Sequence, residues 1–153
     1  MESWERKWSV EELIAAAERE PEPAMLLDVE DSELQLAGRM PERINAQLAA
    51  RGGKPVEGEA AMAALIFHSL AARYAEVLRG ISAITGKRFA KLYIVGGGSR
   101  NRFLNELTAR ATGLTVIAGA AESSTVGNFA VQLAALAGRP DAKTIGEWAR
   151  RLQ

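Results

Sequence analysis

Three consecutive glycines, Gly96, Gly97 and Gly98, stand between an apolar run and a polar segment in the stretch YIVGGGSRNRFLNEL. Glycine has no Cβ and adopts positive φ angles readily, so a backbone made of glycines can turn sharply and approach a ligand closely. A helix that begins directly afterwards would add free N–H groups and the positive end of its dipole. The spacing therefore predicts a turn that binds an anion or a polar ring edge; a tight turn without a ligand is the simpler alternative.

Two common phosphate-binding motifs are not matched by this turn. The dinucleotide motif G-x-G-x-x-G would need glycine where the chain has Asn101, and the sequence lacks the Gly-Lys-Ser/Thr of a P-loop. We therefore expect a ligand less charged than a pyrophosphate, such as the nucleoside part of a nucleotide. Ser99, Asn101 and Arg102 would offer hydrogen bonds to it from the first helical turn.

A second candidate is the segment AESSTVGN, residues 121–128, at the expected start of another helix. Its polar and glycine residues are Glu122, Ser123, Ser124, Thr125, Gly127 and Asn128. Hydroxyl side chains at such a place cap a helix, and a glycine lets another element approach. This plain interpretation is at least as good as ligand contact.

The elements expected around the glycines are helices with one short parallel sheet. Helices are expected over roughly residues 9–20, 41–51, 57–85, 99–112, 123–137 and 144–152, and strands over roughly 91–95 and 114–119. Residues 21–40 are expected to form an ordered loop with a short extended piece. Strand, helix and strand at this spacing form a parallel βαβ unit, so the expected fold class is α/β and helix-rich.

Several residues set the expected ends and faces of these helices. Ser9 with Glu12, and Thr144 with Glu147, have capping-box spacing, and Gly86 stands where a helix stops. In the long helix, Tyr74, Val77 and Ile81 continue one apolar face while other apolar residues cover a second. We therefore expect the long helix at the centre of the fold.

Composition limits the classes of function. The 153 residues are about one domain in length, so residues 1–153 are read as a single unit. The 19 basic and 19 acidic side chains cancel, which argues against nucleic-acid binding. Without cysteine, and with His68 as its one histidine, the chain is not expected to bind a metal. We expect His68 to pack at the border of the core rather than act as a base, because it has no identifiable catalytic partner.

The expected compartment is the cytoplasm, without a membrane partner. No apolar run approaches the roughly 20 residues of a membrane span. The start of the chain, Met1–Arg6, also lacks the apolar region of a signal peptide.

The segment LYIVGGGSRNRFLNELTARATGLTVIAG, followed by ESSTVGN, closely resembles the C-terminal domain of the FGGY carbohydrate kinases, and among them the rhamnulokinase branch. Asn101, Asn105 and the TARATGL after them are typical of that branch. The stretches WSVEELIAAAE, MPERI and IFHSLAARYAEVL are similar to it as well. The resemblance covers essentially the whole chain.

This resemblance implies part of an enzyme built of two ribonuclease H-like (actin-like ATPase) domains that close on ATP and a sugar. It implies that Gly97, and then Gly96, Gly98 and Asn101, contact the adenosine part of ATP, and that ESSTVGN lies near the hinge. The family's sugar site, first phosphate loop and catalytic Asp belong to a region upstream of the one matched here. No catalytic residue is therefore expected in this chain, and Mg²⁺ would be needed only in the complete enzyme.

Two hypotheses from different classes follow. In the first, the chain is the C-terminal piece of a rhamnulokinase-like enzyme that phosphorylates a ketose such as L-rhamnulose, and it is inactive alone. In the second, it is a stand-alone interaction or regulatory module that kept the fold without the chemistry. A third option, an unrelated helical domain, would be excluded by two parallel strands with the glycine turn at their carboxyl ends. The uncovered sheet edge predicts binding to a missing N-terminal kinase domain or self-association.

Overall fold

The computed structural model describes residues 8–119 and 121–152, so the prediction about a signal peptide at Met1–Arg6 lies outside the described residues. Contacts within the chain divide it into two compact units. Unit 1 is Met1–Phe89 with Phe103–Leu114, and unit 2 is Ala90–Arg102 with Thr115–Gln153. The assignment of residues 1–153 to one piece of a single kinase domain stays a prediction.

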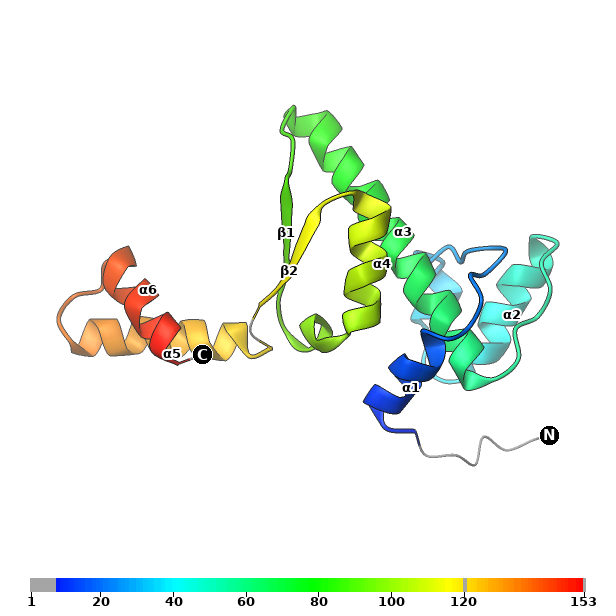
Figure 1. Ribbon diagram of the computed structural model, residues 1–153, viewed down its shortest axis with the longest axis horizontal. Helices are drawn as coiled ribbons and strands as arrows, with labels where there is room; N and C mark the ends of the chain where they lie inside the picture. The colour runs from blue at the N-terminus through cyan, green and yellow to red at the C-terminus, as the bar shows by residue number, and fades with distance from the viewer. Residues whose placement is uncertain (1–7, 120, 153) are drawn as a thin grey trace. The chain divides into compact units, whose positions relative to one another are not determined.

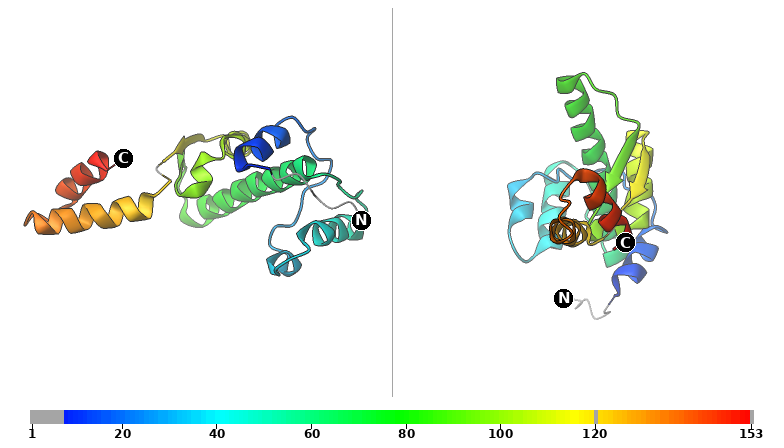
Figure 2. Two further views of the ribbon diagram at one scale, coloured as in Figure 1. Left: turned by 90° about the horizontal axis from the view of Figure 1, so that it is seen from below. Right: turned by 90° about the vertical axis from the view of Figure 1, so that its left-hand side faces the viewer.

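Unit 1 consists of helices gathered around one long helix. Its elements are α1 (Val10–Ala17), the 3-10 turn η1 (Ser32–Gln35), α2 (Met40–Ala50), α3 (Glu59–Thr85) and α4 (Arg102–Thr112), of which Arg102 itself belongs to unit 2. α1 packs along α3, as Figure 1 and the left view of Figure 2 show. These bounds confirm the predicted helices to within a few residues.

Local sequence signals explain where these helices begin and end. The Ser9 hydroxyl accepts the N–H of Glu12 at 3.1 Å, and the Glu12 carboxylate accepts the N–H of Ser9 at 3.0 Å. The predicted capping box is therefore confirmed. α3 ends at Gly86, whose φ of 67° lies in the left-handed region that glycine adopts without strain.

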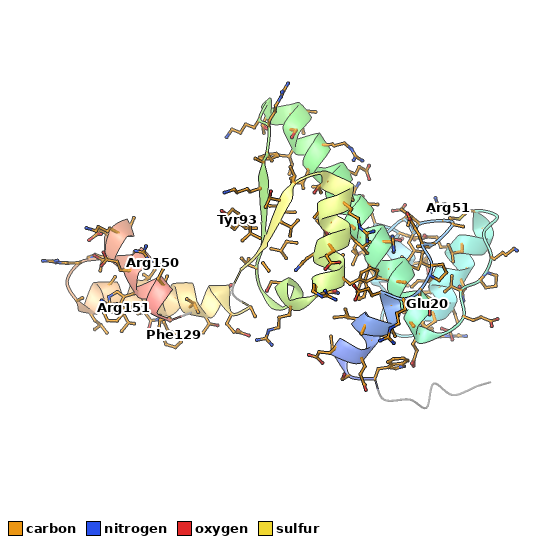
Figure 3. The ribbon with its side chains drawn as sticks, in the orientation of Figure 1. Glu20, Arg51, Tyr93, Phe129, Arg150 and Arg151 are labelled. Carbon is orange, nitrogen blue, oxygen red and sulfur yellow. The ribbon has the colours of Figure 1, made fainter. Side chains whose placement is uncertain are left out.

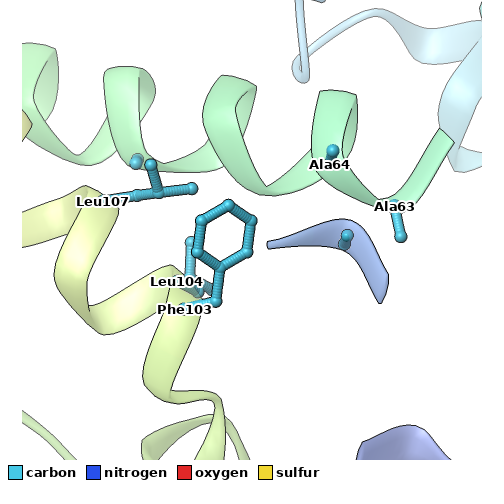
Figure 4. Close-up of a cluster of buried hydrophobic side chains, with 7 residues drawn as sticks. Ala63, Ala64, Phe103, Leu104 and Leu107 are labelled. Atoms are coloured by element: carbon cyan, nitrogen blue, oxygen red, sulfur yellow. The ribbon is translucent and has the colours of Figure 1, made fainter. Parts of the chain in front are cut away.

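A first cluster of buried side chains joins α4 to α3 and α1. Its members from α4 are Phe103, Leu104 and Leu107, and they face alanines of α3 and Ala17 of α1 (Figure 4). Because alanine side chains are short, the Phe103 ring lies close to the α3 backbone. Phe67 of α3 meets that ring edge to face, with the ring centroids 6.2 Å apart.

A second cluster joins α2 and the loop before it to α3. Its buried members are Leu27, Ile44, Leu48, Met62 and Leu65. A buried serine of α3, Ser69, ties the loop to this cluster. The Ser69 hydroxyl accepts the N–H of Leu27 at 2.9 Å and donates to the carbonyl of Leu65 at 2.7 Å. Both polar groups of the serine are thus satisfied inside the core.

α3 contributes to both clusters, which confirms its predicted central place, but part of one predicted apolar face is exposed. Tyr74, Val77 and Ile81 are 38%, 42% and 41% exposed. The periodicity correctly placed these residues on one face, since they recur at helical spacing. It could not show whether the described part of the chain would cover that face.

By length and composition alone, α3 is also the one helix in residues 8–119 and 121–152 that could cross a membrane. This differs from the expectation that no such run exists. Central helices of soluble proteins meet the same criterion, and seven α3 residues are buried inside unit 1. The prediction that the chain has no membrane partner stays a prediction.

Unit 2 contains the sheet and the last two helices. β1 (Lys91–Ile94) pairs in parallel with β2 (Thr115–Ala118). The 3-10 turn η2 (Gly97–Arg100) follows β1, and α5 (Ser123–Leu136) packs on α6 (Ala142–Arg151). The helix-rich α/β fold class with one short parallel βαβ unit is thereby confirmed.

Two segments differ from their sequence prediction because an aspartate caps a helix. No extended piece forms in residues 21–40; Asp31 accepts the N–H of Glu33 at 3.0 Å and starts η1 instead. Asp141 caps α6 by accepting the N–H of Thr144 at 2.9 Å, so Thr144 lies inside the helix it was predicted to cap. Aspartate caps helices at least as well as threonine, which the spacing pattern alone did not weigh. The Thr144 hydrogen bonds hold the pKa of the Asp141 carboxyl below its ordinary value.

Candidate functional site

The glycine turn lies at the carboxyl ends of both strands. β1 ends at Ile94 opposite the end of β2 at Ala118, and the N–H of Gly119 donates to the carbonyl of Ile94 at 2.8 Å. In open parallel sheets this edge is where ligands bind. Two parallel strands with the turn at this edge exclude the third option, an unrelated helical domain.

The backbone of the turn requires glycine at position 96. Gly96 has φ 83° and ψ −171°, a combination that is open almost only to glycine. Its carbonyl accepts the N–H of Ser99 at 3.0 Å and the Ser99 hydroxyl at 2.7 Å. Gly96 therefore shapes the turn whether or not a ligand is present.

Gly97 and Gly98 are not required for the same reason. Neither has a positive φ, and a Cβ on either residue would have no heavy atom within 4 Å. Both are exposed at the start of η2. The chain thus keeps two peptide units bare although its own packing would tolerate side chains there. A bare backbone beside open space fits the close approach of a flat ring and its ribose.

The polar side chains predicted to accompany the glycines have different surroundings. Ser99 is buried, and its hydroxyl donates to the carbonyl of Gly96 at 2.7 Å, which stabilises the turn. Asn101 is half-buried, and its N–H donates to the carbonyl of Gly98 at 3.0 Å. Arg102 is exposed at the first residue of α4. Their contact with a nucleotide stays a prediction.

Gly119 is a residue of this edge that the sequence analysis treated only as the end of a strand. A Cβ on Gly119 would lie 2.9 Å from the Cγ1 of Val95, which is closer than real contacts. The strand ends therefore approach too closely for a side chain at this position. The signal in the sequence was a glycine that ends a β-branched run, which marks close backbone approach as readily as a strand end.

The second candidate segment forms the start of α5. Glu122 precedes the helix without a side-chain capping bond, and Ser124 and Thr125 are exposed within its first turn instead of preceding it. A Cβ on Gly127 would meet no heavy atom within 4 Å, so nothing in the described residues packs closely against this glycine. Asn128 is exposed beside it. Ligand contact by this segment stays a prediction.

His68 lies at the border of the first cluster. Its side chain is half-buried and meets the Phe103 ring edge to face, with centroids 5.9 Å apart. Burial lowers the pKa of His68, with a smaller opposite effect from Glu22. This is the packing position predicted for it. In residues 8–119 and 121–152, no three His, Cys, Asp or Glu side chains are grouped so that they could hold a metal ion.

Comparison with known proteins decides the family. The C-terminal domain of the FGGY family of carbohydrate kinases matches residues 1–136, which is most of the chain. The chain belongs to this family. The predicted resemblance of this FGGY chain to the rhamnulokinase branch is also confirmed by its curated relatives.

Both relatives compared here are named rhamnulokinases. The protein of Klebsiella pneumoniae strain 342 is 40% identical to this FGGY chain over 124 residues, which are 81% of the chain and 25% of that protein. The protein of Enterobacter sp. strain 638 is 52% identical over 77 residues, 50% of the chain and 16% of that protein. The chain therefore spans at most about a quarter of the length of these relatives.

Proposed function

We propose that this chain is the C-terminal, adenosine-binding part of an ATP-dependent, rhamnulokinase-like sugar kinase. The bare backbone of Gly97 and Gly98, at the carboxyl edge of two parallel strands, carries this proposal. Membership of a carbohydrate kinase family supports ATP as the nucleotide. Gly97 is the main contact to the adenosine, and Gly96, Gly98 and Asn101 are further contacts. Ser99 stabilises the turn, and Arg102 lies at the edge of the site.

The same proposal places the chain in a larger fold. Residues 1–153 are part of the second of two ribonuclease H-like domains, and the start of α5 lies near the hinge between them. The substrate is a ketose, with L-rhamnulose as the first candidate because the relatives are named rhamnulokinases. We place the enzyme in the cytoplasm, where its ATP and sugar are available.

The isolated chain is proposed to be inactive in phosphoryl transfer. The reaction needs a base, an aligned sugar hydroxyl and a triphosphate whose charge is neutralised by Mg²⁺. In this proposal the chain forms one wall of the nucleotide site, and the described residues contain no group of His, Cys, Asp or Glu side chains that could hold the metal. The upstream region of the kinase supplies the rest. ATP consumption by the purified chain with any ketose would contradict this part of the proposal.

Calorimetric titration with ATP tests the nucleotide site. We expect weak binding from one wall of a site, with a Kd of about 1 mM, which corresponds to roughly 4 kcal/mol. Gly97→Trp fills the open space above the turn and is expected to abolish the binding heat. Gly80→Trp is the matched control, since Gly80 is exposed on α3 and a Cβ there also meets nothing within 4 Å. Equal binding by both variants would contradict the site.

The second candidate is a stand-alone interaction or regulatory module. The observation that favours it is the set of large apolar side chains left exposed on β1, directly after it and on α3, including Tyr93, Val95 and Val77. The two proposals differ in the same titration. No heat with ATP at millimolar concentration, from a chain that is folded by circular dichroism, would favour the interaction module.

A further inference from the structure

A cavity of about 430 Å³ lies within unit 1. Three segments distant in sequence form its walls: Glu22, Pro23 and Leu26 from the loop after α1; His68, Ala71 and Ala72 from α3; and Leu107, Arg110 and Ala111 from α4. Its size falls in the range of small-molecule sites, roughly 300–1,000 Å³. Most of the wall is apolar, with one acid, one base and one imidazole among it.

Of these three polar side chains, Glu22 and Arg110 are exposed and His68 is half-buried. Within residues 8–119 and 121–152, none of Glu22, His68 and Arg110 takes part in a hydrogen bond or an ion pair. The Phe103 ring, edge to face with His68, fixes the imidazole against α4. Apolar walls with a few convergent polar groups are typical of binding sites for small molecules.

The opposite charges of Arg110 and Glu22 favour a ligand that carries both an anionic group and a hydrogen-bond donor. Arg110 offers planar paired donors that match a carboxylate, whereas Glu22 repels an anion and accepts hydrogen bonds. Because burial lowers the pKa of His68, the imidazole is neutral near pH 7 and both donates and accepts one hydrogen bond. A ligand with only negative groups would be repelled by the Glu22 carboxylate.

We propose that this cavity binds a small carboxylic acid with an amino or hydroxyl group on the neighbouring carbon. The carboxylate pairs with Arg110, the amino or hydroxyl group donates to Glu22, and a short aliphatic side chain packs on Leu26 and Leu107. The site shares no residue with the nucleotide site proposed above. A test of this carboxylic acid site is therefore independent of whether ATP binds at the glycine turn.

Titration of the 153-residue chain with three matched acids, followed by NMR, tests this site. His68 is the one histidine, so its imidazole signals report the cavity without ambiguity. The probes are L-alanine, L-lactate and propionate, which carry an ammonium, a hydroxyl and neither group beside the carboxylate. We expect saturable shifts with alanine, lactate or both, at an affinity at least about fivefold tighter than for propionate.

Two substitutions separate the site from general surface binding. Arg110→Gln is expected to weaken binding of the preferred acid at least about tenfold, as loss of a charge-assisted pair does. Arg88→Gln is the matched control, because Arg88 is exposed and outside the walls of this cavity. Absence of any His68 shift with alanine and lactate at about 50 mM would overturn the proposal. The proposal would also be overturned if propionate bound as tightly as alanine and lactate, or if Arg110→Gln and Arg88→Gln lost the same affinity.

The pH dependence supplies a second readout. Around His68 the charged groups that line the cavity are Glu22 from the loop and Arg110 from α4. As the pH falls through the lowered pKa of His68, the ring gains a positive charge beside the bound carboxylate. Calorimetry is therefore expected to show tighter binding with falling pH, and His68→Gln to remove that trend. A trend that survives in His68→Gln would overturn this role of the imidazole.

Discussion

Adjacent glycines of the turn have different roles. Gly96 holds a backbone conformation that is nearly restricted to glycine, whereas Gly97 has ordinary dihedral angles and open space where a Cβ would lie. Stability accounts for the first glycine but not for the second. The proposed nucleotide contact would account for the absence of a side chain at Gly97.

This difference predicts that two alanine substitutions have different effects on stability. Gly96→Ala is expected to lower the free energy of unfolding by about 1–3 kcal/mol, because alanine is strained at its φ and ψ. Gly97→Ala is expected to change that free energy by less than about 0.5 kcal/mol. Urea unfolding followed by circular dichroism measures both. A loss at Gly97 as large as that at Gly96 would show that both glycines serve the fold.

The residues of the candidate site were predictable from the sequence only where neighbours along the chain determine them. The place of Gly96–Gly98 between a strand and a helix followed from the local pattern, and the structure has it there. The close approach of Gly119 to Val95, and the convergence of Glu22, His68 and Arg110, join segments far apart in sequence. Such contacts depend on the packing of whole elements, which spacing and periodicity do not report.

For the helices and strands, the best predictions rested on caps and the weakest on faces. The capping box at Ser9 and the left-handed Gly86 are local hydrogen-bonding and backbone effects, and both are present. The apolar face of α3 at Tyr74 and Ile81 was identified correctly but is exposed. Periodicity shows that a face is apolar; the partner that covers it must be found elsewhere.

The Phe103 side chain joins α4 to α3 in the first cluster. Phe103 is 5% exposed and fills the space over the α3 alanines, as Figure 4 shows. Phe103→Ala is therefore expected to cost about 3–5 kcal/mol in free energy of unfolding, through lost burial and the cavity left behind.

A phenylalanine of α5 provides the matched control. Phe129, labelled in Figure 3, is 53% exposed, so Phe129→Ala is expected to cost less than about 1 kcal/mol. Chemical unfolding of both variants measures the difference. Similar losses for the two would mean that α4 does not hold unit 1 together in the way described.

For the whole molecule, the exposed sheet predicts self-association. The described sheet has two strands, so each keeps one unpaired edge. Tyr93 of β1, labelled in Figure 3, is 62% exposed, and Val95 directly after β1 is 57% exposed. Unpaired edges and apolar surface favour pairing with another chain. Sedimentation is expected to show association that rises with concentration and weakens in Tyr93→Lys.

Val10→Lys is the control for this experiment. Val10 is 71% exposed on α1, far along the chain from the sheet, and the substitution adds the same charge. It is expected to leave association unchanged. A clean monomer at all concentrations, with a high melting temperature, would contradict the prediction, and so would an equal effect of the two lysines.

Titration of the 153-residue chain with ADP, followed through its backbone amide signals, tests the nucleotide site most directly. We expect saturable shifts at Gly96, Gly97, Gly98 and Asn101, at a concentration of about 1 mM, while signals around the Phe103 cluster stay in place. ADP is used because the proposed contacts are to the adenosine part. Shifts that are absent, or that gather away from the turn, would contradict the claim that this chain forms one wall of a nucleotide site.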